Sequence, residues 1–397
     1  MKALSKALSE IPVSAPTAVD ALVRERRAAG EEIISFCVGE PDFETPPDIA
    51  LAGIEAIRAG KTKYTNPSGI PELRRAAAEQ LFSRDGLSYE SSQVVVTTGA
   101  KYAVFAAVMA ICDPGDEVIV PSPMWPSYRP ILRLCGVALR EVVCSAETGY
   151  KLTPAALAGA CTEKTKAMIL NNPNNPTGML YSPAELAALA AVCREKDIYV
   201  ISDEIYGRLA YDGRVFLPMA AAGEEMAERT VTITGVSKSY AMTGWRIGFA
   251  AASKEIARRI SILVNHTTGS PCSVSQEAAL AALLGTDAET ETMRSVYEAR
   301  RNTIVPALRK VPFVSFTVPE GAFYILLDVR EAIRRSDSLK DDFTFAMELL
   351  REERVALVPC ADYGAPGHLR ISYTLEEPEA LEGIARLAAF VERRCRA

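Results

Sequence analysis

The sequence has few of the residues that build metal centres and disulfide frameworks. Histidine occurs only twice, at His266 and His368, so a histidine-rich metal centre and an H-E-x-x-H motif are excluded. The nine cysteines are scattered and form no C-x-x-C pair, which argues against a zinc ribbon or a disulfide framework. We therefore expect no metal and a reducing compartment, the cytoplasm.

Long apolar runs and an excess of positive charge are also missing. The longest apolar run, residues 103–112, is too short to cross a bilayer. Lys and Arg total 44 against 50 Asp and Glu, a net charge of −6 that disfavours nucleic acid or an anionic membrane as a partner. The N-terminus has a signal-like charge, but Glu10, Pro12 and Pro16 interrupt any apolar core, so we expect an exposed arm.

Two common phosphate-binding motifs are absent. Gly60-Lys61-Thr62 ends like a P-loop, but Glu55 stands where the first glycine is required. No G-x-G-x-x-G follows a predicted strand, so the fingerprint of a dinucleotide fold is missing as well.

The length and the apolar pattern predict an α/β protein of more than one domain. At about 150 residues per domain, 397 residues give two to three domains. Short β-branched or apolar runs alternate with helical segments rich in alanine and leucine, which is typical of a mostly parallel sheet covered by helices. The predicted strands are residues 94–96, 117–120, 139–143, 167–170, 198–202, 230–234 and 247–251.

From about residue 291 the pattern changes to that of a smaller α+β domain. A charged helix through Arg301 is followed by predicted strands at 323–327 and 369–373, with a helix at 343–354 between them. We expect a large ligand-binding domain over residues 46–290, and a small domain formed by the N-terminal arm, residues 1–45, with residues 291–397. A ligand of the large sheet should bind where its strands end.

Lys238 stands in a turn of small residues just beyond a predicted strand. Desolvation and neighbouring positive charge lower the pKa of a lysine and make its amine a usable nucleophile or base. Eight residues later, Arg246 could clamp an anion such as phosphate with its planar guanidinium. Taken alone, such residues are more often a solvated lysine and a surface arginine.

The segment from Gly235 to Gly248 resembles the pyridoxal-phosphate attachment motif of class I and II aminotransferases. Its Met-Thr-Gly-Trp-Arg-Ile-Gly, together with the earlier Gly-Glu-Pro-Asp-Phe, is similar to the bacterial aspartate-aminotransferase subgroup. The resemblance covers nearly the whole chain, through residues 38–43, 63–69, 99–101, 123–125, 171–178, 202–206 and 369–372. It implies the fold-type I architecture, with a mostly parallel seven-stranded sheet, pyridoxal 5'-phosphate as cofactor, and a homodimer with shared active sites. The family usually has a hydroxyl residue where Gly235 stands, so one phosphate contact is missing or replaced by water.

The resemblance assigns the chemistry to Lys238, Asp203 and Tyr206. Lys238 would carry the cofactor as an imine and then move a proton between the substrate Cα and the cofactor. Asp203 ends a predicted buried strand, where a carboxylate needs a cationic partner, and the protonated ring nitrogen of the cofactor is such a partner. Tyr206 and Asn175 would bind the phenolate oxygen of the ring.

The cofactor phosphate is expected at the strand-to-helix junction that contains Gly99, because free N–H groups and the helix dipole attract anions there. By resemblance, Ala100 and Lys101 supply N–H groups and Arg246 neutralises the phosphate. Tyr64 would reach the same phosphate from the neighbouring subunit.

Substrate recognition needs a clamp for the α-carboxylate that every amino acid carries. By resemblance Arg370 is that clamp, helped by Gly39 and Asn175, and Trp125 stacks on the cofactor ring beside the substrate. Lys101 stands where the aspartate subgroup has a lysine that pairs with the distal carboxylate of the substrate. It could instead serve only as a charge at the helix end.

The activity implied by the resemblance is amino-group transfer from an amino acid, aspartate, to a 2-oxo acid, 2-oxoglutarate, in a ping-pong cycle. The same scaffold also supports other outcomes: transfer from aromatic or neutral amino acids, β-elimination, decarboxylation, or oxidation by dioxygen. A non-catalytic regulator with a pyridoxal-phosphate sensor would need an added DNA-binding segment, which the sequence does not show.

Overall fold

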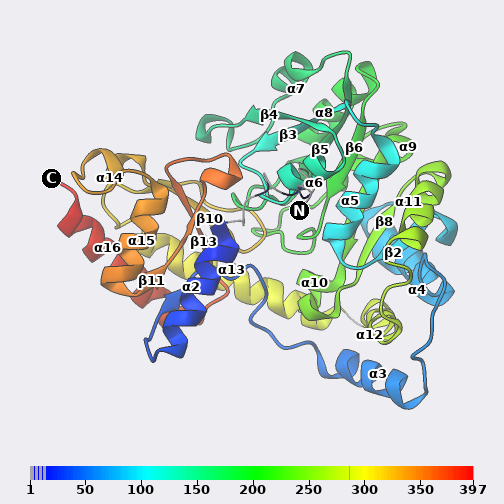
Figure 1. The fold of residues 1–397 in the computed structure, drawn as a ribbon, viewed down its shortest axis with the longest axis horizontal. Helices are drawn as coiled ribbons and strands as arrows, with labels where there is room; N and C mark the ends of the chain where they lie inside the picture. Colours follow the sequence, from blue (N-terminus) through cyan, green and yellow to red (C-terminus); the bar gives the residue numbers. More distant parts are fainter. Residues whose placement is uncertain (1–3, 5–7, 9–10, 12–14, 286, 397) are drawn as a thin grey trace.

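The structure, a computed structural model, describes residues 4, 8, 11, 15–285 and 287–396, called here the described chain. Its centre is a seven-stranded sheet in the order β2-β8-β7-β6-β5-β3-β4 (Figure 1). The strands from β7 to β4 are parallel to their neighbours, and β8 is antiparallel to both β7 and β2. The predicted mostly parallel sheet is therefore confirmed. Its strands are β2 (Val94–Thr97), β3 (Glu117–Ser122), β4 (Ala138–Val143), β5 (Thr165–Asn171), β6 (Tyr199–Asp203), β7 (Thr230–Gly235) and β8 (Gly248–Ala251).

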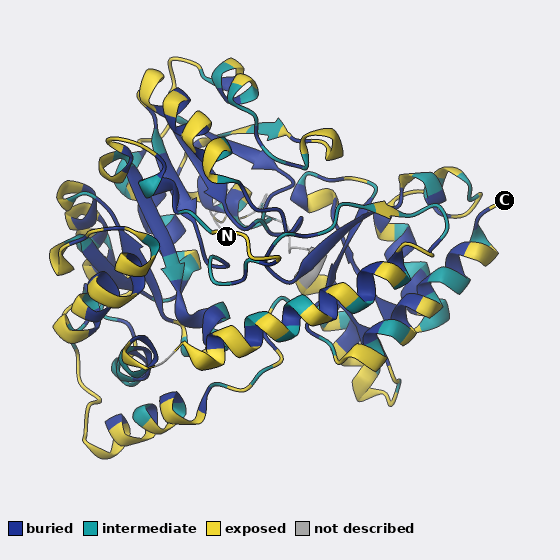
Figure 2. Ribbon diagram, turned by 180° about the vertical axis from the view of Figure 1, so that it is seen from behind, coloured by how far each residue is buried: buried dark blue, intermediate teal, exposed yellow. Residues whose placement is uncertain are grey.

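Helices cover both faces of this sheet, which explains why its central strands β6 and β7 are buried along almost their whole length. In β3, Val118 and Val120 belong to the apolar cluster that includes α5, α6 and α11, whereas Ile119 belongs to the cluster on the opposite face, with α7 and α8. Figure 2 shows the buried strands between helices whose outer turns are exposed. The helices of this part are α3 (Pro47–Arg58), α4 (Pro71–Ala76), α5 (Ala100–Ile111), α6 (Tyr128–Leu134), α7 (Pro154–Ala160), α8 (Pro183–Glu195), α9 (Met226–Arg229), α10 (Val236–Ser239), α11 (Lys254–His266) and α12 (Ser273–Leu284).

A second, four-stranded sheet is antiparallel, in the order β12-β13-β10-β9, and lies beside a two-stranded parallel pair of β1 and β11. The predicted strands at 323–327 and 369–373 are β10 and β13, each displaced by one residue. Of the predicted N-terminal arm, residues 1–3, 5–7, 9–10 and 12–14 lie outside the described chain. The elements of this part are α2 (Ala15–Ala28), β1 (Ile34–Ser35), α13 (Ala288–Leu308), β9 (Ser315–Phe316), β10 (Tyr324–Asp328), α14 (Arg330–Arg334), α15 (Asp342–Glu353), β11 (Val355–Ala356), β12 (Val358–Pro359), β13 (His368–Ser372) and α16 (Glu377–Arg394).

Two arginines of the long helix α13 form ion pairs with loops, and the second pair joins the two parts of the chain. Arg300 makes a two-pronged ion pair with Asp42, at 2.9 and 2.8 Å, in the loop between β1 and α3. The neighbouring Arg301 pairs with Asp212, which lies between β6 and α9, and also donates to the carbonyl of Pro319. Bidentate arginine–carboxylate pairs fix orientation as well as distance. The Arg301–Asp212 pair therefore helps to set how the small sheet faces the large one.

The β12–β13 loop is held by one buried carboxylate. Asp342, in the first turn of α15, accepts backbone hydrogen bonds from Cys360, Ala361 and Gly367 at 2.8, 2.9 and 3.2 Å. Within that loop the carbonyl of Tyr363 accepts a hydrogen bond from the backbone N–H of Met124, next to β3 of the large sheet. The loop is thus a second fixed contact between the two sheets.

Within the described chain, no helix is long and apolar enough to cross a membrane, and no group of three or more His, Cys, Asp or Glu side chains is placed to hold a metal ion. The nine cysteines are all free thiols.

Asp342→Ala should destabilise the protein strongly, because it removes the buried carboxylate that accepts three backbone hydrogen bonds from the β12–β13 loop. We expect the free energy of unfolding to fall by about 3 kcal/mol. The matched control is Asp341→Ala, which removes only the exposed N-cap of α15 and should cost about 1 kcal/mol. Urea unfolding followed by circular dichroism measures both losses, and equal losses would contradict the structural role given to Asp342.

Candidate active site

A cavity of about 780 Å³ opens between the two sheets, at the carboxyl ends of β5 and β6. Its lining includes ten of the twelve predicted site residues: Gly39, Ala100, Lys101, Trp125, Asn175, Asp203, Tyr206, Lys238, Arg246 and Arg370. Gly99 lies directly behind this lining, under Arg246. Tyr64 is not part of it and is fully exposed. Residues from opposite ends of the chain therefore meet in one place.

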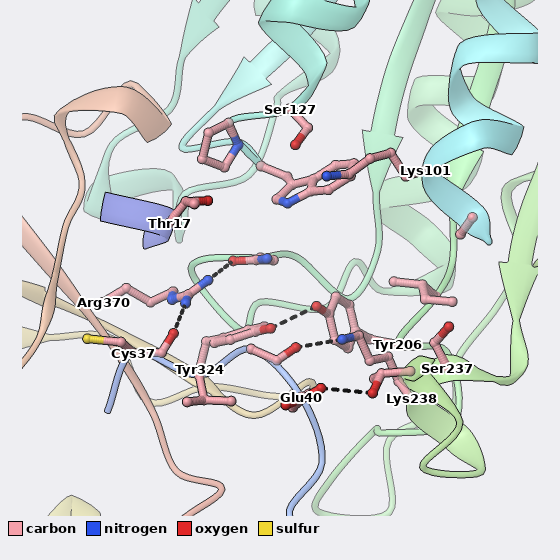
Figure 3. Close-up of a pocket in the computed structure, with 18 of the residues that line it drawn as sticks. Thr17, Cys37, Glu40, Lys101, Ser127, Tyr206, Ser237, Lys238, Tyr324 and Arg370 are labelled. Atoms are coloured by element: carbon pink, nitrogen blue, oxygen red, sulfur yellow. Dashed lines mark hydrogen bonds between the residues drawn. The ribbon is translucent and has the colours of Figure 1, made fainter. Parts of the chain in front are cut away.

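The Lys238 amine points into the cavity from the short helix α10, which begins directly after β7 (Figure 3). Its Nζ donates to the backbone carbonyl of Gly39 at 2.5 Å. Burial lowers the pKa of Lys238 to about 8; Glu40 opposes this shift, and the guanidinium of Arg370 adds to it. At pH 7 about a tenth of this amine is therefore uncharged, as a nucleophile or base must be, which is far more than for a solvated lysine.

Gly235, three residues before Lys238, occupies a position with no room for a side chain. A Cβ there would lie 2.9 Å from the carbonyl oxygen of Ile247, the residue directly before β8. Close packing of β7 on β8 therefore accounts for the glycine where the resembling family usually has a hydroxyl residue.

Asp203 is the last residue of β6 and is buried. Its Oδ2 accepts a hydrogen bond from the Tyr128 hydroxyl at 2.6 Å, and burial raises the pKa of the carboxyl group. Within the described chain it forms no ion pair with a lysine or arginine. A buried carboxylate of this kind is stabilised by a cationic ligand atom placed beside it in the cavity.

Arg370 presents a buried cation from the middle of β13. Its guanidinium donates to the Cys37 carbonyl at 2.9 Å and to Asn175 Oδ1 at 3.2 Å, while its Nε has no hydrogen-bond partner in the described chain. The rings of Tyr324 and Tyr363 flank it, with centroids 4.5 and 5.5 Å away. All of these partners are neutral, so an anionic ligand would be the first group to balance the charge.

The start of α5 forms an anion-binding corner. Gly99 precedes the helix with φ of 80°, and a Cβ there would lie 2.4 Å from Nη2 of Arg246, so both conformation and space favour glycine. The first-turn N–H groups of Ala100 and Lys101 have no acceptor within the helix. The N-terminus of α5 and the guanidinium of Arg246 thus lie side by side, as a phosphate site requires.

Trp125 and Lys101 form the opposite wall of the cavity. The Lys101 Nζ lies 5.0 Å from the centre of the Trp125 ring, and burial lowers the pKa of this lysine, with the nearby Arg246 adding to the effect. The Trp125 ring in turn packs edge-on against Tyr128 at 5.3 Å. The cavity therefore has a flat aromatic surface, the Trp125 ring, beside a second cation, Lys101. Lys101 is far from Arg370, the first cation, in the sequence.

Several residues in or beside the cavity were not predicted from the sequence. Tyr128 binds Asp203, Tyr324 binds the hydroxyl of Tyr206 at 2.9 Å, and the Cys37 carbonyl binds Arg370. Tyr324 lies in an apolar strand, where an aromatic residue is normally core. Tyr128 follows Trp125 by three residues, and that spacing at the start of a helix is the only signal that could have pointed to it.

Comparison with known proteins identifies the family. The model of the family described as "Aminotransferase class I and II" matches residues 31–387. The chain is 41% identical to the aspartate aminotransferase of Bacillus subtilis over 390 residues, 98% of this chain and 99% of that protein. It is 42% identical to the aspartate/prephenate aminotransferase of Cereibacter sphaeroides over 395 residues, again 98% and 99%.

Solved structures agree with this result. The aspartate aminotransferase of Rhizobium meliloti superposes with a TM-score of 0.94 at 36% identity, covering 99% of this chain and all of that one. The Thermus thermophilus aspartate aminotransferase crystallised with maleate gives 0.92 at 38% identity, over 98% of this chain. The predicted fold-type I architecture is therefore confirmed, and this chain is a member of the class I and II aminotransferases, enzymes that use pyridoxal 5'-phosphate.

Proposed function

We propose that this aminotransferase transfers the amino group of aspartate to 2-oxoglutarate, each substrate using the same cavity in turn in a ping-pong scheme. The observation that carries the proposal is that Lys238 shares one cavity with two cations that have no acidic partner in the described chain, Arg370 and Lys101. A dicarboxylic substrate offers one carboxylate to each. Relatives whose names include aspartate aminotransferase support the choice of donor.

The residues of the cavity fit pyridoxal 5'-phosphate. Its phosphate matches the corner made by Gly99, the N–H groups of Ala100 and Lys101, and Arg246. Its ring nitrogen matches the buried carboxylate of Asp203, which would keep a proton there. When bound, the cofactor supplies an aldehyde carbon and a ring that accepts the electron pair left when a substrate Cα loses its proton.

The side chains around the ring would then be Trp125, stacked on one face, and Tyr206 with Asn175 at the phenolate oxygen. Tyr206 can donate its hydroxyl proton, and Asn175 its amide N–H, because the Asn175 oxygen already accepts from Arg370. Both hydrogen bonds favour the ionised phenolate.

Lys238 would act as nucleophile toward the aldehyde and then as the base and acid that moves the proton of the substrate Cα. Its lowered pKa supports both roles, because the amine can lose and regain a proton near neutral pH. Arg370 would orient the substrate by holding its α-carboxylate, with Gly39 and Asn175 beside it. Orientation of this kind aligns the Cα–H bond with the amine.

Lys101 would bind the distal carboxylate of the substrate. Its amine stands over the Trp125 ring on the far side of the cavity from Arg370 and has no ion-pair partner in the described chain. A carboxylate arriving there would gain a charge-assisted hydrogen bond. In this account Trp125 contacts both the cofactor and the substrate.

We also propose that the active form is a homodimer. Tyr64 is fully exposed, and α3 presents Leu51, Ile54 and Ile57 to solvent, with 51%, 47% and 59% of their surface exposed. An apolar helix face of this size is typical of a surface that meets another protein. Through this contact Tyr64 would reach the phosphate in the partner's cavity.

The two sheets support a division into a large domain over residues 46–290 and a small domain over residues 1–45 and 291–397. Each sheet has its own apolar core. The free thiols of all nine cysteines favour a reducing compartment, and we place the enzyme in the cytoplasm.

The proposed reaction is tested with purified protein loaded with pyridoxal 5'-phosphate, aspartate and 2-oxoglutarate. We expect glutamate to form without ammonia or peroxide; ammonia would indicate elimination and peroxide an oxidase.

Lys238→Ala should lose turnover. It should also lose the visible absorption of the lysine-bound cofactor, a bond that borohydride traps in the wild type. The control Lys254→Ala, at an exposed ion pair with Glu90, should keep both. Turnover that survives in Lys238→Ala would contradict the role of this lysine.

Lys101→Tyr should change substrate preference. Loss of the cation removes a charge-assisted hydrogen bond from the distal carboxylate, so kcat/KM for aspartate should fall about tenfold or more relative to that for alanine. The measurement is the ratio of the two kcat/KM values in wild type and variant. Equal losses for both donors would mean that Lys101 serves the helix end or the phosphate and does not select the substrate.

A further inference from the structure

A carboxylate that the proposed chemistry does not use stands at the exposed edge of the cavity. Glu40 lines the cavity and directly follows Gly39, whose backbone carbonyl accepts the hydrogen bond of the Lys238 amine. Figure 3 shows Glu40 on the same side of the cavity as Lys238. The chain itself therefore places this carboxylate next to the loop position that the amine contacts.

Hydrogen bonds between two segments hold Glu40 in place. Its Oε2 accepts a hydrogen bond from the hydroxyl of Thr243 at 2.8 Å. Farther along the same two segments, the Thr45 hydroxyl donates to the backbone carbonyl of Ala241 at 2.9 Å. Together with the bond made by the buried amine, these contacts join the loop of Glu40 to the segment after β7 at three points. The carboxylate is thus held at the cavity and does not turn away into solvent.

The negative charge of Glu40 is not neutralised by another ion pair. In the described chain Glu40 forms no ion pair with a lysine or arginine side chain. It acts on Arg24 of α2, but the guanidinium of Arg24 already pairs with the carboxylate of Asp20. The hydroxyl of Thr243 is neutral, so the carboxylate keeps its charge beside the cavity.

Among the charged groups that act on the Lys238 amine, Glu40 has the largest effect. Burial is the main cause that lowers the pKa of Lys238, whereas Glu40 raises it. The other charges are Arg370 and Arg246, which lower this pKa further, and Asp203, which raises it less than Glu40 does. The cavity also contains tyrosines that are neutral because burial raises their pKa: Tyr206, Tyr324 and Tyr363.

Movement of a proton by Lys238 changes the charge of its amine twice. The neutral amine takes up a proton with its lone pair and becomes an ammonium, and it becomes neutral again when it gives that proton up. A nearby carboxylate stabilises the ammonium and makes proton uptake more favourable. A carboxylate in direct contact would keep the amine charged, so a negative charge at some distance suits a group that must exist in both forms.

We propose that Glu40 is a positioning residue for the proton transfer: its carboxylate, fixed by Thr243, is the counter-charge that stabilises Lys238 while the amine carries the proton of the substrate Cα. This inference rests on the proposed function, in which Lys238 moves that proton. Glu40 acts only through Lys238, and its contribution is electrostatic.

Glu40→Gln tests the counter-charge, because it keeps the size of the side chain and an oxygen that can accept from Thr243 but removes the charge. The first readout is the rate at which the cofactor-free protein captures pyridoxal 5'-phosphate, followed by visible absorption as a function of pH. We expect the midpoint of this profile to fall by about half a pH unit, because the carboxylate is exposed and its effect is screened by solvent. At pH 7 the variant should capture the cofactor about threefold faster than the wild type.

The second readout uses the loaded enzyme. With saturating aspartate, the single-turnover rate of Glu40→Gln should fall about twofold to threefold, because the ammonium form of Lys238 is less stable by about that factor. Faster capture together with slower turnover separates the proposed role from damage to the fold, which would slow both.

Two further variants serve as controls. Glu44→Gln removes the same charge from an exposed residue four positions later in the same loop, and should leave the midpoint and the turnover rate unchanged. A general effect of charge on capture of the anionic cofactor would raise the rate at every pH without moving the midpoint. Thr243→Val keeps the carboxylate but frees it, so the midpoint should fall by less than in Glu40→Gln, and the double variant should match Glu40→Gln alone.

The inference is overturned if Glu40→Gln keeps the wild-type midpoint, if Glu44→Gln lowers the midpoint as much, or if the midpoint falls without any loss of turnover rate. A Thr243→Val protein with the wild-type midpoint would overturn the part given to Thr243. Wild-type protein that forms no visible band with pyridoxal 5'-phosphate would instead overturn the proposed function, and the inference with it.

Discussion

The site depends on one constraint: the amine of Lys238 is buried beside a backbone carbonyl and has no carboxylate partner in the described chain. A buried ammonium of this kind is penalised by desolvation, and the neighbouring Arg370 adds repulsion. The Gly39 carbonyl, 2.5 Å away, provides a hydrogen bond without a full negative charge. The amine is therefore held in place while remaining easy to deprotonate.

The rest of the structure keeps Lys238 and the Gly39 carbonyl in this arrangement. Gly39 lies in a loop on the same side of the molecule as the small sheet. The loop stays near Lys238 because Arg300 forms an ion pair with Asp42, three residues after Gly39. Arg370 reaches the same cavity from β13, whose preceding loop is held by Asp342. Asp203 arrives from the end of β6 in the large sheet. Each charged group is thus carried by a rigid element, and the loops between the sheets are anchored by ion pairs.

Much of this could be predicted from the sequence, for identifiable reasons. Apolar runs such as Val94–Thr97 are short, rich in β-branched residues and separated by helical segments, so the sheet followed from pattern alone. The glycines and polar residues around Lys238 are unusual in composition, and their spacing carried the family resemblance. Arg370 was found through the same resemblance, because a strand arginine is by itself uninformative.

The missed residues share a physical cause. Tyr324 and Tyr128 are aromatic residues in apolar surroundings, and only the strand register and the direction of the helix place their hydroxyls on Tyr206 and Asp203. The acceptor for Arg370 is the backbone carbonyl of Cys37, which no side-chain pattern can signal. Contacts made by backbone atoms, or across sheets, depend on the assembled fold.

The most direct test of the central claim is the rate at which the cofactor-free protein captures pyridoxal 5'-phosphate, followed by visible absorption as a function of pH. If Lys238 has a pKa of about 8, the rate constant should rise about tenfold per pH unit below that value and become level above it. A rate that keeps rising to about pH 10, as expected for a solvated lysine, would contradict the account.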